Sequence, residues 1–138
     1  MQNLTSRREA VTGAFALLCE AVAVAQGQPQ VAREPVFKHE LPDIKMDHWE
    51  VTVSYVDLVP GVVGKAHRHA GFVLAYVLEG AIVTKISGQP ETTYTAGQMF
   101  YEAPGSIHEV SRNASATQSA KLLAMIFAPK GATLTVPI

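Results

Sequence analysis

From residue 49 onward, apolar side chains recur at every second position within short segments, and turns containing glycine or proline separate these segments. In the first segment Trp49, Val51, Val53 and Tyr55 alternate with mostly polar neighbours before Pro60. A period of two is the pattern of a half-buried β-strand, and no convincing helical period follows residue 30. Further strands are expected at 73–78, 81–87, 92–94, 99–102, 107–112, 121–127 and 133–136. Many short strands joined by such turns predict an all-β domain, either a sandwich or a closed barrel.

The length of 138 residues suits one domain with its own core and is too short for two ordinary domains. Hydrophobic residues make up 48% of the chain and charged residues 17%, which is typical of a globular protein. The net charge is −1 and the basic residues form no block, so we expect no nucleic-acid partner, because phosphate binding needs clustered positive charge. Cys19 is the single cysteine, which excludes a disulfide within the monomer.

The first 25 residues have the features of an export signal. Arg7 and Arg8 precede an apolar run over 10–25, and Ala23 and Ala25 supply small side chains before a cut at Gln26. The paired arginines resemble those of a twin-arginine signal. The run is short for a bilayer, so we expect a periplasmic or secreted bacterial protein with no stable membrane insertion after cleavage.

The alternative is a helix that remains on the folded protein, capped by Thr5 or Ser6, and the protein would then be cytoplasmic. The expected organisation is therefore a signal segment or helix over 1–25, an N-terminal arm over 26–48 and a β-barrel over 49–138. His39 and His48, which lie in the arm, are expected at the surface.

His67 and His69 are separated by one residue on an extended segment, so their side chains leave the same face. Neutral imidazoles in this arrangement can share one transition-metal ion. The pair alone is weak evidence, because two exposed strand histidines would have the same spacing. A third histidine, His108, opens a later strand after a Pro-Gly turn.

The two histidine segments together resemble the motifs of the cupin superfamily. The stretch "PGVVGKAHRHAGFVLAYVLEG" is similar to the first motif, G(X)5HXH(X)3-4E(X)6G, and "GQMFYEAPGSIHEVSRN" is similar to the second, G(X)5PXG(X)2H(X)3N. Positions that match are Gly61, His67, His69, Gly80, Gly97, Gly105 and His108. Ala103 stands where proline is usual, and Asn113 comes one residue late.

This resemblance implies a small single-domain cupin, folded as a double-stranded β-helix of the jelly-roll type. It implies that His67, His69 and His108 meet inside the barrel mouth and hold one divalent transition metal, which is Fe, Mn, Ni, Zn or Cu. Tyr55, Val73, Val77, Phe100 and Met125 are expected to fill or line the barrel, because apolar alternation indicates burial.

The chain departs from the first motif at the usual glutamate, which falls at Val73 or Leu74. Three outcomes follow: a three-histidine site with open positions, a fourth ligand from another strand, or a site that has lost its metal. Glu102 and Tyr76 are the candidate substitutes, as ligand or catalytic group, although the sequence does not fix the direction of either side chain.

The leading hypothesis is a metal-dependent enzyme, a dioxygenase or isomerase that acts on a small organic molecule. The alternative is a non-catalytic module that captures a small ligand or a metal, since fold alone does not determine function. A metal-free isomerase that uses His67 or His69 as a base is a third hypothesis. A homodimer is also expected, because strand edges of small β-barrels often pair with a second copy.

Overall fold

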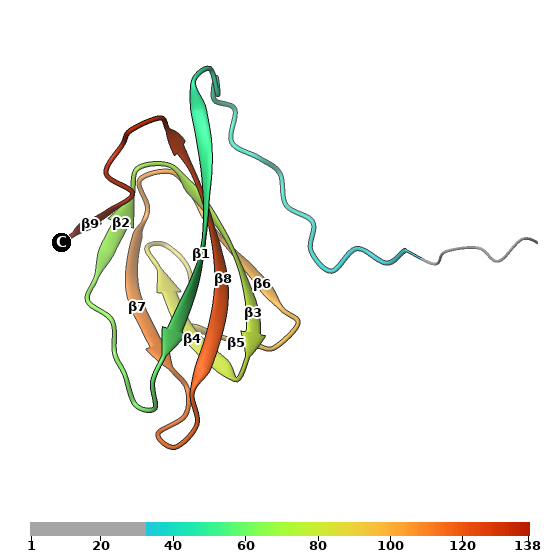
Figure 1. The fold of residues 1–138 in the computed structure, drawn as a ribbon, viewed down its shortest axis with the longest axis vertical. Helices are drawn as coiled ribbons and strands as arrows, with labels where there is room; N and C mark the ends of the chain where they lie inside the picture. Colours follow the sequence, from blue (N-terminus) through green and yellow to red (C-terminus); the bar gives the residue numbers. More distant parts are fainter. Residues whose placement is uncertain (1–32) are drawn as a thin grey trace, which may run out of the picture. The chain divides into compact units, whose positions relative to one another are not determined.

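The computed structural model describes residues 33–138, so the expected signal segment and the first part of the arm lie outside the described residues. Within this range the secondary structure is entirely strand and turn, and no helix is long and apolar enough to cross a membrane. The strands, drawn in Figure 1, are β1 (Trp49–Leu58), β2 (His67–His69), β3 (Phe72–Glu79), β4 (Ala81–Ile86), β5 (Thr92–Thr95), β6 (Met99–Glu102), β7 (Ile107–Asn113), β8 (Ala120–Pro129) and β9 (Thr135–Pro137).

The strands form two antiparallel sheets. One sheet has the order β1-β8-β3-β6, and the other has the order β5-β4-β7-β2-β9. Strands that are distant in sequence are neighbours in both sheets, as in the pairing of β1 with β8 and of β2 with β7 (Figure 1). The expected all-β, double-stranded β-helix architecture is therefore confirmed. The short segment of His67 and His69 is itself a strand that joins the second sheet on both sides.

The core lies between the two sheets. Val73, Ala75 and Val77 alternate along β3 and are at most 2% exposed, and Phe100 of β6 is also buried. These positions confirm the expectation that Val73, Val77 and Phe100 fill the barrel. The intervening residues of β3 belong to the opposite face of the sheet.

The expectation was wrong for Tyr55 and Met125. The side chain of Tyr55 is 70% exposed, and Val53 of the same strand is also exposed. Met125 pairs with Val53 on one side and Leu74 on the other, so it shares this outward face. Alternation establishes which residues share a face, but it does not say which face the second sheet covers.

One buried polar side chain closes the end of the barrel. Asn113, the last residue of β7, is 4% exposed, and its Nδ2 donates hydrogen bonds to the backbone oxygens of Leu58, Val59 and Gln118 at 2.9, 3.2 and 2.8 Å. Its Oδ1 accepts a bond from the backbone N–H of Ser115. The motif asparagine therefore joins the ends of β1 and β7 to the loop before β8.

A tight turn at Glu79-Gly80 joins β3 to β4. Gly80 has a φ of 70°, a backbone conformation that residues other than glycine rarely adopt. A Cβ at this position would lie 2.8 Å from the backbone oxygen of Ser119. The motif glycine is needed for both reasons.

The described part of the arm, residues 33–48, contains no strand and is mostly exposed. His39 and His48 are exposed, as expected. The His39 ring lies 4.1 Å from the ring of Tyr101 on β6, which gives this stretch one of its contacts with the barrel.

Candidate metal centre

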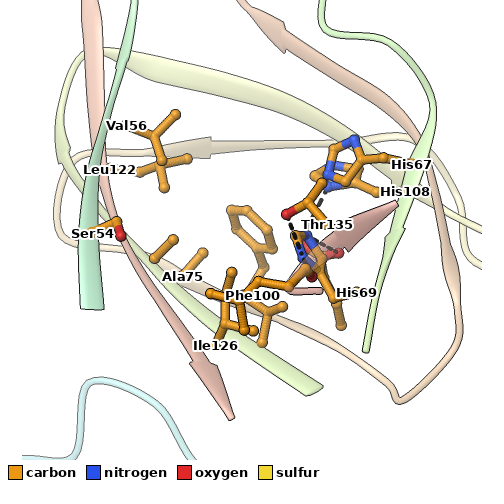
Figure 2. A pocket seen from close by; sticks show the side chains of 14 residues that line it. Ser54, Val56, His67, His69, Ala75, Phe100, His108, Leu122, Ile126 and Thr135 are labelled. Carbon is orange, nitrogen blue, oxygen red and sulfur yellow. Dashed lines mark hydrogen bonds and ion pairs between the residues drawn. The ribbon is translucent and has the colours of Figure 1, made fainter. Parts of the chain in front are cut away.

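A cavity of about 330 Å³ lies between the two sheets, and its two walls differ in chemistry. The second sheet and its adjoining loop supply His67, His69, His108, Leu134 and Thr135. The first sheet supplies a wall that is apolar except at two positions, formed by Ser54, Val56, Val73, Ala75, Phe100, Glu102, Leu122, Ala124 and Ile126. Figure 2 shows the three histidines gathered at one end, with Val56, Leu122 and Ala75 opposite them and Phe100 in between.

Sheet register brings the histidines together. His67 of β2 pairs directly with His108 of β7, and His69 pairs with Thr135 of β9. Residues opposite each other in an antiparallel pair point to the same face, and so do residues two apart in one strand. The His67 ring centroid consequently lies 4.9 Å from that of His69 and 5.0 Å from that of His108.

Backbone carbonyls orient two of the rings. The Nδ1 of His67 lies 2.8 Å from the oxygen of Lys65, and the Nδ1 of His69 lies 2.9 Å from the oxygen of Leu134. Because a carbonyl only accepts, each Nδ1 carries the proton and donates it. The lone pair of each neutral ring is then on Nε2, the arrangement that second partners impose on metal-binding histidines.

Glu102 lies beside the rings of His69 and His108. Its Oε1 is 3.2 Å from Nδ1 of His108, and its Oε2 is 3.8 Å from Nε2 of His69. Glu102 and His108 are each 4% exposed. Their remaining polar atoms, Oε2 of Glu102 and Nε2 of His108, are buried without a hydrogen-bond partner. A buried polar atom left unpaired costs roughly 1–3 kcal/mol, so this arrangement is suited to a further binding partner.

The pKa of His69 is lowered below the usual 6.5, and the main cause is desolvation by burial. The nearby Glu102 carboxylate and the bond to Leu134 act in the opposite direction, but they do not outweigh burial. A lowered pKa keeps this imidazole neutral at neutral pH, and the neutral ring is the form that ligates a metal.

Residues 54–126 match the family model of the cupin domain. The chain belongs to the cupin family. No curated protein matches it. The family assignment agrees with the two-sheet fold and with the motif positions of the three histidines.

Several solved structures resemble this cupin. An uncharacterised conserved protein with a double-stranded β-helix domain from Klebsiella pneumoniae subsp. pneumoniae MGH 78578 has a TM-score of 0.54 and 18% identity, and the match covers 68% of this chain and 78% of that one. An oxalate oxidase in complex with the substrate analogue glycolate has a TM-score of 0.56 and 22% identity, over 64% and 46%. A DMSP lyase from Ruegeria pomeroyi DSS-3 has a TM-score of 0.55 and 17% identity, over 63% and 42%. At these identities the likeness concerns the fold alone.

The donor set of this cupin is compatible with the metal that its family motifs imply. Within residues 33–138, no three His, Cys, Asp or Glu side chains lie close enough together to hold a metal ion as they stand. The three imidazoles nevertheless face one cavity, two of them have Nε2 free, and the third has a buried Nε2 without a partner. Nitrogen donors of this kind, with a carboxylate beside them, suit a borderline transition metal better than Mg²⁺ or Ca²⁺.

The structure brings together His67, His69, His108 and Glu102, but it does not bring Tyr76 to the site. Tyr76 alternates with buried Ala75 and Val77, so it lies on the other face of β3 and is absent from the cavity lining. Its proposed role as ligand or catalytic group is therefore wrong for a geometric reason.

Thr135 is a lining residue that the sequence does not reveal, although a strand was expected there. Its Oγ1 lies 3.2 Å from Nδ1 of His69. Thr135 reaches His69 because β9 pairs with β2. The motif spacing does not predict that pairing.

Proposed function

We propose that this cupin binds one divalent transition metal through Nε2 of His67, His69 and His108, and that it acts as a metal-dependent dioxygenase or isomerase on a small organic molecule. The observation that carries the proposal is the cavity itself, in which three imidazoles line one end and apolar side chains line the other. When bound, the ion would supply a Lewis acid and coordination positions for substrate or O₂. Fe, Mn, Ni, Zn and Cu all accept such donors.

The chain's own residues would orient the donors and the substrate. The backbone oxygens of Lys65 and Leu134 hold the protons of His67 and His69 on Nδ1, which directs the lone pairs of Nε2 to the site. Phe100 packs edge-on against His108, with ring centroids 6.1 Å apart, and limits movement of that ring. Glu102 is the one carboxylate among the described lining residues, so it is available either to the ion or to a substrate proton.

The apolar wall favours a particular class of substrate. Its aliphatic side chains and Phe100 would bind an apolar body and exclude water. A polar group at one end of that molecule would then face the histidines. The cavity thus suits a small molecule with one chelating oxygen- or sulfur-containing end, such as a diketone, a flavonol fragment or a thiol, better than a compact dicarboxylate.

The alternative is a non-catalytic module that captures a small ligand or a metal. It is favoured by the small number of free proton-transfer groups, since the other polar side chains described in the lining are the hydroxyls of Ser54 and Thr135. Oxygen consumption by anaerobically iron-loaded protein with diketone, flavonol and thiol panels distinguishes the two hypotheses. Turnover supports the enzyme, and metal binding without turnover across metals and panels supports the module.

The metal claim is tested by elemental analysis of purified protein. We expect one transition-metal ion per chain, and a loss of most of it in His67→Ala, His69→Ala and His108→Ala. His39→Ala is the matched control, because this histidine is exposed and lies outside the lining of the cavity. Less than about a tenth of an equivalent in the unaltered protein, after dialysis against each of the five metals, would refute the proposed site.

A further inference from the structure

Val73 and Glu102 are directly opposite each other in the β3–β6 ladder. Opposed residues on antiparallel strands point to the same face with Cβ atoms about 4.5–5.5 Å apart. Val73 is 2% exposed and Glu102 is 4% exposed, and both line the cavity. The valine stands where the first cupin motif has its glutamate, so the missing carboxylate is replaced in space by one from the neighbouring strand.

We propose that Glu102 supplies to the metal, from β6, the carboxylate that the cupin motif places on β3. This inference rests on the proposed metal site and names its fourth protein ligand. Leu74, the other position at which the motif glutamate could fall, is excluded as its equivalent, because it pairs with Tyr101 and Met125 on the opposite face.

The distances support a ligand that is already near its place. Oε2 of Glu102 and Nε2 of His69 are 3.8 Å apart, which is too long for a direct hydrogen bond. Two atoms that bind one ion tetrahedrally at about 2.1 Å lie about 3.4 Å apart, so closing the gap requires a shift of only a few tenths of an ångström. Oε2 also has no other partner, although it is buried.

Glu102 has a competing role as an orienting group. Its Oε1 lies 3.2 Å from Nδ1 of His108, in the position of the carboxylates that stand behind metal-bound histidines. The two roles respond differently to substitution. Glutamine keeps an oxygen that can accept from His108, but it removes the negative charge and the strong metal donor.

The experiment is a titration of metal-free protein with Co²⁺. Binding is monitored by visible absorption and by calorimetry. We expect one Co²⁺ per chain in the unaltered protein and an affinity lowered by more than about 100-fold in both Glu102→Gln and Glu102→Val. The matched control is Glu109→Gln, whose carboxylate is next to His108 in sequence but is paired with Lys85. This control is expected to keep the affinity and the absorption spectrum.

The double variant Val73→Glu/Glu102→Val moves the carboxylate to the motif position. We expect it to regain Co²⁺ affinity to within about tenfold of the unaltered protein. Failure of a folded double variant to recover, judged by circular dichroism, would overturn the equivalence of the two positions. If the double variant does not fold, the Co²⁺ affinity of Glu102→Gln still decides whether Glu102 is a metal ligand.

Two negative results are distinguishable. If Glu102→Gln binds Co²⁺ within about tenfold of the unaltered protein and with the same spectrum, Glu102 only orients His108 and this inference is overturned. If the unaltered protein binds no Co²⁺ and His67→Ala changes nothing, the metal site itself fails, and Glu102 as its ligand fails with it.

Discussion

His108 and Asn113 both point into the interior, although they are an odd number of positions apart on β7. In a regular strand such residues would face opposite sides. The β4–β7 register pairs Lys85 with Val110 but Ile86 with His108, so no residue of β4 stands opposite Glu109 in the ladder. This extra residue is a β-bulge, and it restores the common direction of the two side chains. The asparagine that comes one residue late in the motif is thereby explained.

Deletion of Glu109 should be tolerated. It removes the bulge and gives His108 and Asn113 an even spacing, so both side chains still face inward. We expect the deleted protein to fold with a melting temperature within about 5 °C of the original, measured by circular dichroism. Deletion of Thr84 from the regular part of β4 is the control, since it reverses the faces of its neighbours and should prevent folding. Loss of the fold in the Glu109 deletion would show that the bulge itself is required.

Asn113→Ala should lower the free energy of unfolding by about 2–4 kcal/mol. The substitution removes one buried amide and leaves the backbone oxygens of Leu58 and Gln118, among others, without their donor. Urea denaturation measures the loss, and Gln89→Ala, an exposed loop substitution, is the control. An effect no larger than that of the control would mean that water replaces the amide without cost.

Most of the strands and the three histidines of the cavity could be predicted from the sequence, because both depend on residues that are close together in the chain. Alternation located the strands other than β2, and motif spacing selected His67, His69 and His108, which line one cavity in the structure. Glu102 was only one of two candidates, because its direction depends on how β6 pairs with β3. Register of that kind arises from contacts between distant segments, and a single sequence does not display it. The same limit explains the error for Tyr55, whose strand covers the cavity with its other face.

Gly71→Ala should be strongly destabilising, although this glycine is not a matched motif position. A Cβ at Gly71 would lie 1.9 Å from the backbone oxygen of Phe127 and 2.9 Å from a ring atom of Trp49. β8 would have to move away from the start of β3, at a cost of about 3 kcal/mol or more. Gly88→Ala is the control: its Cβ meets nothing within 4 Å, and its positive φ of 81° should cost about 1 kcal/mol. Equal losses in urea denaturation would contradict the close packing at Gly71.

We also expect a homodimer that forms along β1. This strand is the edge of its sheet, and it exposes Val51, Val53 and Tyr55 on one face. An edge strand of ten residues can pair antiparallel with a second copy of itself, which satisfies its free backbone groups and sets these side chains beside their two-fold mates. Light scattering after size exclusion should give twice the chain mass, and Val53→Lys should give a monomer. A monomeric mass for the unaltered protein at about 100 μM would refute the expectation.

Residues 1–25 are predicted to direct export through the twin-arginine route, which carries folded proteins. Expression of the full chain in a bacterium should give a periplasmic product that begins at Gln26, as measured by mass spectrometry of the intact protein. Arg7→Lys/Arg8→Lys should retain the precursor in the cytoplasm, because this route requires the arginine pair. Arg33→Lys, which lies beyond the expected cleavage site, is the matched control and should be exported normally. A cytoplasmic product that keeps residues 1–25 would contradict export and favour the alternative in which this segment stays on the protein.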